Sequence, residues 1–394
     1  MPKTLTSEKL AQATELVRAA GVDCWMVFDR ETAESGDPAL PLILDGGLTW
    51  QSALIVTREG KKIAIVGNFD ADPIKASGEW DEVVPYVRGI RLPLLEVLDR
   101  VCGPDPKVAV DFSTNDVKAD GLSHGMFLLL TEYLQGSSFE GCLVGAEGIV
   151  MALRARKTPE EVKRIRAAIK AGDEIFKEIG KFAKVGRTEL EVFQHVQSLI
   201  DQKGYGYGWD RAGNPIVNSG PHSMAGHGKP SATITIEKGH VFHVDLGVIK
   251  DGYSSDIQRC WYVGGAAPKD VFEAARAVNA CITNAAAVLK PGVEGWEVDA
   301  VARQTLKEAG YEEYMHALGH QVGRVAHDGG AILGPQWERY GSTPTIPVHK
   351  DEVYTLELGV MLPDRGYLGI EEIVVVTADG CEFLSERQLA IPAL

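Results

Sequence analysis

Short apolar runs alternate with amphipathic stretches over the first 150 residues of the chain. Runs with strand-like composition cover Cys24–Phe28, Ala53–Thr57, Lys62–Val66, Glu82–Val87 and Val108–Phe112. Helical spacing begins after Thr6-Ser7 and recurs around Leu92–Val101 and Gly125–Leu134. The proline- and glycine-containing stretch Glu31–Gly47 is typical of a loop. Strands that alternate with helices predict a three-layer or open-sheet α/β domain over residues 1–152.

A second domain is expected over residues 153–394. The sequence Thr158-Pro159-Glu160-Glu161 predicts the start of its first helix. Thr158 is the N-cap, Pro159 is the first helical residue, and Glu161 completes a capping box. One apolar face then follows, with Val162, Ile165, Ile169, Phe176 and Ile179. Further on, Lys184–Gly204 and Lys290–Gly310 match in Lys, Gly, Glu, Val and the final Gly. This echo indicates either a duplicated α/β half or two ordinary capped helices.

Composition narrows the class of protein. The chain has 394 residues, 45% of them hydrophobic, and a formal net charge of −15, which disfavours nucleic acid and anionic membranes as partners. The polar N-terminus and the absence of a long apolar run argue against a signal peptide or membrane span. The six cysteines are scattered, as in cytosolic proteins with reduced thiols. We therefore expect a soluble, cytoplasmic, two-domain protein.

Two hairpins carry facing acidic residues. In the first, a Lys-Asp-Gly turn lies between Asp245 and Asp256, so the two carboxylates should lie on adjacent strands, within two residues of facing each other. In the second, a Pro-Asp-Arg-Gly turn lies midway between Glu357 and Glu371. Carboxylates that face each other among apolar residues repel one another unless they are protonated or bridged by a cation.

A glycine-rich stretch between the hairpins contains three histidines, His316, His320 and His327. Glycines beside His320 permit close approach of the backbone to a site. Four carboxylates with an imidazole nitrogen suit two divalent cations such as Mn²⁺, Co²⁺, Fe²⁺ or Zn²⁺. Two such cations can activate one water molecule as a nucleophile.

The ordered set Asp245, Asp256, His320, Glu357 and Glu371 resembles the pita-bread metallopeptidases, namely prolidase, aminopeptidase P and methionine aminopeptidase. The resemblance covers residues 157–394 and includes the motifs around Gly252-Tyr253, Gly319-His320 and Ile370-Glu371. The first 150 residues resemble the creatinase-type domain that methionine aminopeptidases lack. The implied fold class is α+β, with an N-terminal α/β domain and a C-terminal domain of duplicated α/β halves around a mostly antiparallel curved sheet.

The resemblance also implies a function. It assigns the five residues to two cations, Mn²⁺ first among them, and makes Glu357 the general base as well as a ligand. His227 and His327 are implied to contact the scissile carbonyl of a short Xaa-Pro peptide, most simply a dipeptide. Members of the family are commonly homodimers.

Three positions depart from the family pattern, at Gln258-Arg259-Cys260, Leu358 and Gly369. An arginine usually stands at the position of Gly369 and contacts the free carboxylate of dipeptide substrates. Arg324, or Arg30 acting across a dimer, could replace it. The alternatives are therefore an aminopeptidase P acting on longer peptides and a metal-dependent hydrolase or lyase of a small zwitterion. A metal-free creatinase-like enzyme and a binding protein are disfavoured, because all five ligands persist.

Overall fold

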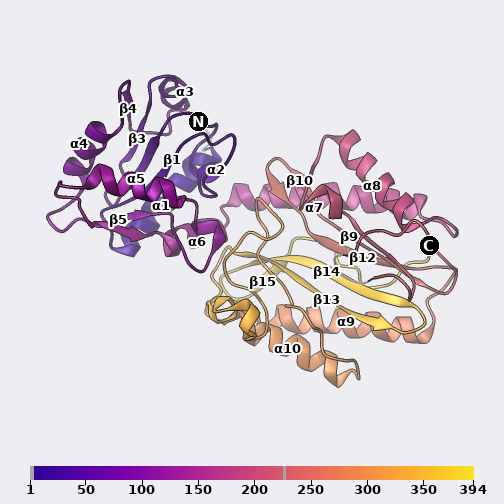
Figure 1. Cartoon of the computed structure of the whole chain (residues 1–394). Helices are drawn as coiled ribbons and strands as arrows, with labels where there is room; N and C mark the ends of the chain where they lie inside the picture. Colours follow the sequence, from indigo (N-terminus) through magenta and orange to yellow (C-terminus); the bar gives the residue numbers. More distant parts are fainter. Residues whose placement is uncertain (1–3, 225–227) are drawn as a thin grey trace. The chain divides into compact units, whose positions relative to one another are not determined.

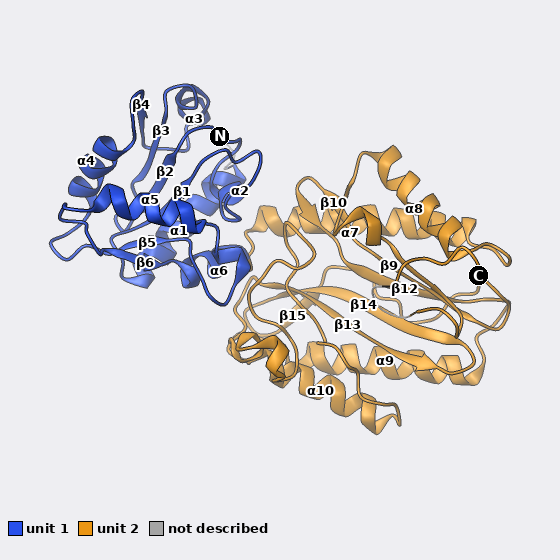
Figure 2. Ribbon diagram, viewed as in Figure 1, with its two compact units in different colours: residues 1–154 blue, residues 155–394 orange. Residues whose placement is uncertain are grey.

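The computed structural model describes residues 4–224 and 228–394, which divide into two compact units, 1–154 and 155–394 (Figure 2). The boundary lies at the end of helix α6 (Glu147–Ala155), two residues beyond the one expected from the sequence. In the described ranges, no helix is both long and apolar enough to cross a bilayer. None of the six cysteines forms a disulfide there.

Unit 1 is a three-layer α/β domain built on one mixed sheet (Figure 1). Its strands lie in the order β4-β3-β2-β1-β5-β6, with bounds Glu82–Tyr86, Lys62–Gly67, Ser52–Thr57, Cys24–Asp29, Val108–Val110 and Leu143–Gly145. Alternate residues of β1 enter two separate cores: Trp25 and Val27 pack with helix α1 (Leu5–Ala20), whereas Met26 packs with α4 (Arg91–Val101) and α5 (His124–Leu134). Because successive side chains of a strand point to opposite faces, apolar side chains lie on both faces of the sheet, and a layer of helices covers each face.

Three details of unit 1 differ from the sequence-based expectation. Helix α1 is capped by Thr4, whose side chain accepts from the Ser7 N–H, so the helix begins before Thr6 rather than after it. The stretch expected to be a loop contains a short helix, α2 (Leu40–Ile43). Helix α3 (Ala71–Ser77), strand β6 and helix α6 were not predicted, because short elements give too few periods of hydrophobic alternation to be recognised.

Unit 2 contains two similar arrangements of a helix pair beside antiparallel strands (Figure 1). The first pair is α7 (Pro159–Phe182) and α8 (Glu189–Lys203), which pack against the strands β7 (Gly206–Tyr207), β8 (Ile216–Ser219), β9 (Val241–Leu246), β10 (Val248–Lys250), β11 (Tyr253–Ser254) and β12 (Ile257–Tyr262). The second pair is α9 (Lys269–Val288) and α10 (Gly295–Glu308): α9 packs against β13 (Val353–Leu362) and β14 (Gly366–Val376), α10 packs against α9, and β15 (Cys381–Phe383) lies at the edge of the sheet.

Helix starts in unit 2 follow the sequence signals. The capping box of α7 is formed, since Thr158 N–H donates to Glu161 and Glu161 N–H donates to the Thr158 hydroxyl. The echoed segments fold alike. Each opens with a glycine at φ 91°, continues through a capping box into α8 or α10, and closes with a glycine of positive φ, Gly204 or Gly310.

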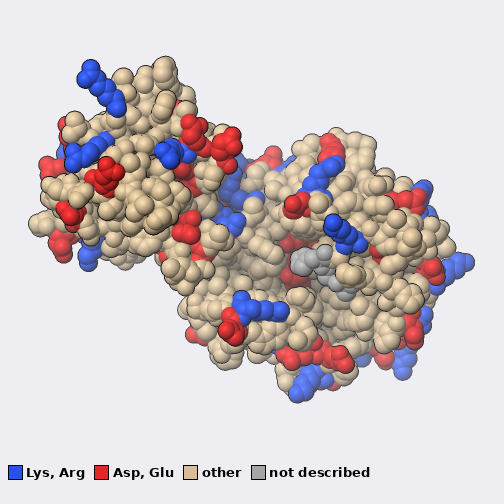
Figure 3. Space-filling model, viewed as in Figure 1, with Lys and Arg blue, Asp and Glu red and all other residues tan. Residues whose placement is uncertain are grey.

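Charged side chains are interspersed on the face of the molecule drawn in Figure 3, where acidic and basic groups alternate over both units. Acidic side chains also appear in the middle of unit 2 on this face.

Candidate metal centre

In the first acidic pair, Asp245 lies on strand β9 and Asp256 immediately precedes strand β12. Asp245 is directly opposite Gln258, so Asp256 lies two residues from facing Asp245, as the position of the turn predicts. The turn residues Asp251 and Gly252 have φ of 51° and 77°, the left-handed values of a tight type I′ hairpin turn. Residues two apart on a strand point to the same face. Both aspartates and Gln258 therefore belong to one face of the hairpin.

The second acidic pair lies on β13 and β14, where Glu357 is directly opposite Glu371. This register confirms that the two glutamates face each other across the hairpin. Glu371 is buried, with 1% of its surface exposed, while the side chain of Glu357 is 18% exposed. The pair therefore has one enclosed carboxylate and one that solvent can reach.

His320 is held beside β13 by backbone contacts. Its N–H donates to the Thr355 hydroxyl at 3.1 Å, and its carbonyl accepts from Thr355 N–H at 2.9 Å. A Cβ atom on the neighbouring Gly319 would lie 2.0 Å from the Thr355 carbonyl oxygen. Only glycine allows this approach, which explains why a glycine precedes the histidine.

The five residues predicted as ligands come together in unit 2. The ligand atoms within each of three groups lie within 4.8 Å of one another: Asp245, Asp256 and Glu371; His320, Glu357 and Glu371; and Asp256, His320 and His327. His320 Nε2 lies 3.3 Å from Glu357 Oε1 and 3.6 Å from Asp256 Oδ2. The arrangement joins residues from two hairpins and one loop, and their role as ligands stays a prediction.

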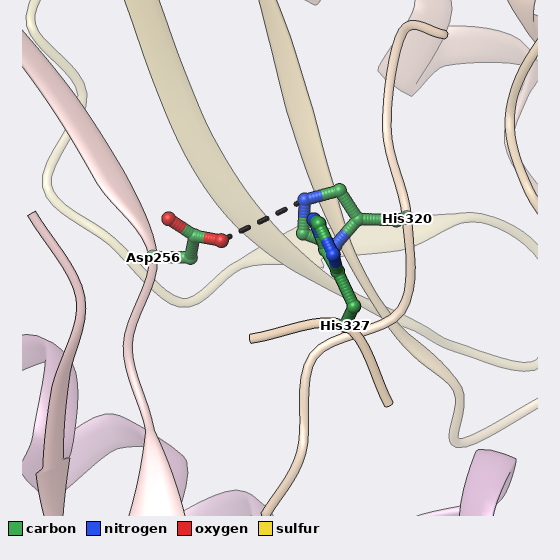
Figure 4. Close-up of side chains that lie close together, drawn as sticks. All are labelled: Asp256, His320 and His327. Carbon is green, nitrogen blue, oxygen red and sulfur yellow. Dashed lines mark ion pairs between the residues drawn. The ribbon is translucent and has the colours of Figure 1, made fainter. Parts of the chain in front are cut away.

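His327 lies next to this set. Its ring packs edge-on against the His320 ring, with centroids 4.2 Å apart and planes at 82° (Figure 4). In the same view, His320 points a ring nitrogen at the Asp256 carboxylate. His327 is exposed, so this imidazole can meet a molecule that enters from solvent.

The carboxylates lack the donors that buried anions need. Asp245 Oδ1 and both oxygens of Glu371 are buried, and no hydrogen-bond partner for them lies among the described residues. Burial, together with the charges of Asp256 and Glu357, raises the pKa of Asp245 and of Glu371 well above the usual range. Burial also raises the pKa of Asp256 to about 7, against the opposing effect of His320. Such a cluster calls for compensating positive charge, and its oxygen and imidazole donors fit divalent cations.

The remaining predicted residues are placed as follows. His227 lies outside the described residues. Arg324 stands between the two histidines in sequence, with its guanidinium 5.6 Å from the centre of the Tyr253 ring. The Tyr253 hydroxyl donates to Glu161, so Arg324 stacks on a ring that is tied to helix α7. Arg30 is an exposed residue of unit 1. None of these positions tests the proposed contact with substrate.

Sequence reasoning did not find the polar residues that surround the acids. Gln258 donates from Nε2 to Glu357 Oε2 at 2.7 Å, and its Oε1 lies 3.1 Å from His243 Nε2. The Tyr367 ring packs edge-on against His243, 5.0 Å between centroids. The available signal was the alternation along β9 and β12, which puts His243 and Gln258 on the face of Asp245.

Comparison with known proteins gives matches across the chain. Residues 163–378 match metallopeptidase family M24. A Xaa-Pro dipeptidase of Pyrococcus furiosus is 31% identical over 248 residues, which cover 62% of this chain and 67% of that protein. An uncharacterized peptidase of Staphylococcus aureus is 27% identical over 346 residues, or 85% of this chain and 88% of the relative.

Solved structures share the fold of the whole chain. A Xaa-Pro dipeptidase from Bacillus anthracis superposes with a TM-score of 0.74 at 22% identity, covering 99% of this chain and all of that one. An X-Pro aminopeptidase from Thermotoga maritima gives 0.70 at 24% identity, covering 98% of this chain and 99% of that chain. These matches confirm the pita-bread resemblance and the α+β fold class that it implied.

Proposed function

Since the chain belongs to metallopeptidase family M24, we propose that it hydrolyses the Xaa-Pro bond of dipeptides with two divalent cations, Mn²⁺ being the native ion. The observation that carries this proposal is that, among the described residues, buried oxygens of Asp245 and Glu371 have no hydrogen-bond partner. Asp256, His320 and Glu357, which can each offer a ligand atom to a metal ion, lie beside them. When bound, the cations supply a Lewis acid and lower the pKa of water, so that hydroxide becomes available near neutral pH.

Residues of the chain would bind the ions, accept the proton and bind the scissile carbonyl. Asp245, Asp256, His320, Glu357 and Glu371 would hold the ions. Glu357, the more exposed glutamate, accepts the proton of the attacking water as general base, with one oxygen held by Gln258. His327 donates a hydrogen bond to the scissile carbonyl oxygen and stabilises its developing charge. His227 has the same task in this proposal, from outside the described residues.

The length of the substrate defines the main alternative, an aminopeptidase P acting on longer Xaa-Pro peptides. One feature favours it: position 369 is a glycine, and no cationic side chain projects from there toward the acids. For dipeptides, Arg324 is the proposed clamp for the free carboxylate, because it lies in the loop between His320 and His327. Replacing Arg324 by Ala should then raise KM for dipeptides and leave KM for tripeptides unchanged.

We also propose a homodimer. Apolar side chains of unit 1 are exposed where three neighbouring strands end or begin: Trp50 before β2, Phe69 after β3 and Val87 after β4, which are 56%, 80% and 82% exposed. Such a patch is typical of an interaction surface. Light scattering of the wild type and of Phe69→Asp measures this: the wild type should have twice the chain mass and the variant should dissociate.

One assay tests the function. The metal-free protein is incubated with Mn²⁺ and offered an Xaa-Pro dipeptide, an Xaa-Pro tripeptide and creatine, with release of the N-terminal residue or of urea as readout. Mn²⁺-dependent cleavage of the dipeptide is the expected result. Cleavage of the tripeptide alone would identify an aminopeptidase P, and the absence of any Xaa-Pro cleavage would refute the peptidase proposal.

A further inference from the structure

Gln258 occupies a central position behind the acidic residues. It lies on β12 directly opposite Asp245 and two residues beyond Asp256, and it is 5% exposed. Its Nε2 donates to Glu357 Oε2 at 2.7 Å, a contact between residues 99 positions apart. A carboxylate oxygen can only accept, so this bond fixes the amide with its NH₂ toward Glu357 and its oxygen away from it.

The oxygen of that amide is held in turn. It lies 3.1 Å from His243 Nε2, within hydrogen-bond distance. On the other side of the ring, Nδ1 lies 3.0 Å from Asn218 Oδ1, while Asn218 Nδ2 donates to the Met224 carbonyl at 2.9 Å. His243 and Asn218 are 3% and 4% exposed. A buried polar chain thus runs from Glu357 to strand β8 and the residues after it.

The Gln258 amide lies close to the backbone of the neighbouring strand β14 at Gly369. A Cβ on Gly369 would lie 2.7 Å from Gln258 Oε1 and 2.5 Å from Tyr367 Cε1. The Tyr367 ring also covers Gly359, the cross-strand partner of Gly369, where a Cβ would lie 2.4 Å from the ring. Glycine at 369 therefore follows from the position of the Gln258 amide and the Tyr367 ring.

We propose that Gln258 is a positioning residue, which holds Glu357 Oε2 in place so that Glu357 can bind a divalent cation and accept a proton. The proposal rests on the function given above. Without the amide, Oε2 of Glu357 loses its hydrogen-bond donor among the described residues, while Oε1 keeps His320 at 3.3 Å. A residue that orients a metal-binding carboxylate typically accounts for about 10- to 100-fold in metal affinity or activity.

The variant Gln258→Met tests this, because methionine has a similar shape and no amide. Gln388→Met is the matched control: the Gln388 side chain makes two hydrogen bonds to the backbone of Cys260 on the same strand, and its backbone N–H, which the substitution keeps, donates to Glu372. Titration calorimetry of the metal-free proteins with Mn²⁺ gives affinity without relying on activity. Thermal unfolding of the same samples reports any loss of stability.

Gln258→Met should weaken Mn²⁺ binding about 10- to 100-fold and lower kcat with little change in KM. Gln388→Met should lower the unfolding temperature and leave Mn²⁺ affinity unchanged. Gly369→Ala should also weaken Mn²⁺ binding, since its Cβ displaces the amide, and the double variant Gln258→Met/Gly369→Ala should be no weaker than Gln258→Met.

Two results with the variants would overturn the proposal: Mn²⁺ affinity and kcat of Gln258→Met equal to those of the wild type, or equal losses of affinity in Gln258→Met and Gln388→Met. Wild-type protein that binds no Mn²⁺ would overturn it as well. Wild-type protein that binds Mn²⁺ but cleaves no Xaa-Pro peptide would refute the proposed function alone, because calorimetry still decides whether Gln258 positions Glu357.

Discussion

Each unit of this protein buries a group of carboxylates, and the two groups differ in what surrounds their oxygens. In unit 1, Asp29 accepts from the N–H of Arg30 and of Asp37, each at 2.7 Å. Asp37 accepts from Ala39 N–H at 2.8 Å, and Asp111 accepts from the Trp25 indole. Asp37 and Asp111 also hydrogen-bond to each other, which requires that one of them carries a proton.

In unit 2 the acids have fewer donors. Among the described residues, three oxygens, on Asp245 and Glu371, have no hydrogen-bond partner, Asp245 and Asp256 hydrogen-bond to each other, and Glu357 accepts from the amide of Gln258. Burial raises the pKa of acids in both units, of Asp37 to about 6 and of Asp256 to about 7. A raised pKa therefore does not separate a structural cluster from a metal centre. The number of unpartnered acceptors differs: among the described residues, one oxygen of the unit 1 cluster, Asp111 Oδ2, has no hydrogen-bond partner, against three in unit 2, which a divalent cation would satisfy.

The largest expected effect comes from Glu371→Gln. This change removes a proposed ligand, so kcat/KM should fall on the order of a thousandfold or more, an effect on the barrier of about 4 kcal/mol. Because one repelling charge disappears, the metal-free variant should unfold at a higher temperature than the metal-free wild type. Peptidase assays and calorimetric scans without metal measure the two effects. If the metal-free variant were less stable than the metal-free wild type, repulsion among the acids of unit 2 would be ruled out. The proposed difference between the acids of the two units would then be wrong.

The next effect is a pH dependence in unit 1. The folded-state pKa of Asp37, about 6, lies above its ordinary value of 3.8, so the native state binds the proton more tightly. Protonated Asp37 therefore adds about 3 kcal/mol to the free energy of unfolding below pH 4. This contribution is lost as the pH rises through 6. Urea unfolding of the full chain at pH 4 and pH 7 measures it, with Asp37→Asn as reference. A difference between the two proteins that does not change with pH would contradict this assignment.

Metal should act on one unit only. At a free Mn²⁺ concentration of 100 times Kd, one site stabilises the native state by about 2.7 kcal/mol. Hydrogen exchange should therefore slow in β13 and β14 when Mn²⁺ is added and stay unchanged in β1 and β5. Protection gained equally in both units would show that the ion does not discriminate between the two clusters.

The smallest effect is expected for Asp29→Asn. The amide retains one acceptor oxygen, so one of the two backbone N–H groups loses its partner, which costs about 1–2 kcal/mol. Denaturant unfolding gives the loss of stability, and calorimetry should give a Mn²⁺ affinity equal to that of the wild type. A weaker affinity would mean that the cluster of unit 1 influences the metal centre.

Much of the fold and of the proposed site could be predicted, because the signals are local. A hairpin register is set by its own turn, so the turns at Asp251-Gly252 and Pro363–Gly366 were enough to place each acidic pair. The helix start at Thr158 depends on four consecutive residues. The resemblance to a known family then supplied His320 as the fifth ligand and the function.

Only the tertiary structure decided how these pieces meet. The two hairpins and the His320 loop are distant in sequence, and packing of their strands brings Gln258 to Glu357. Tyr367 and Gln258 fill the space that a side chain at position 369 would need, which makes the change to glycine understandable. Alternation along a strand determines the face on which a side chain lies. Which distant residue it touches there is determined by the long-range packing of the whole domain.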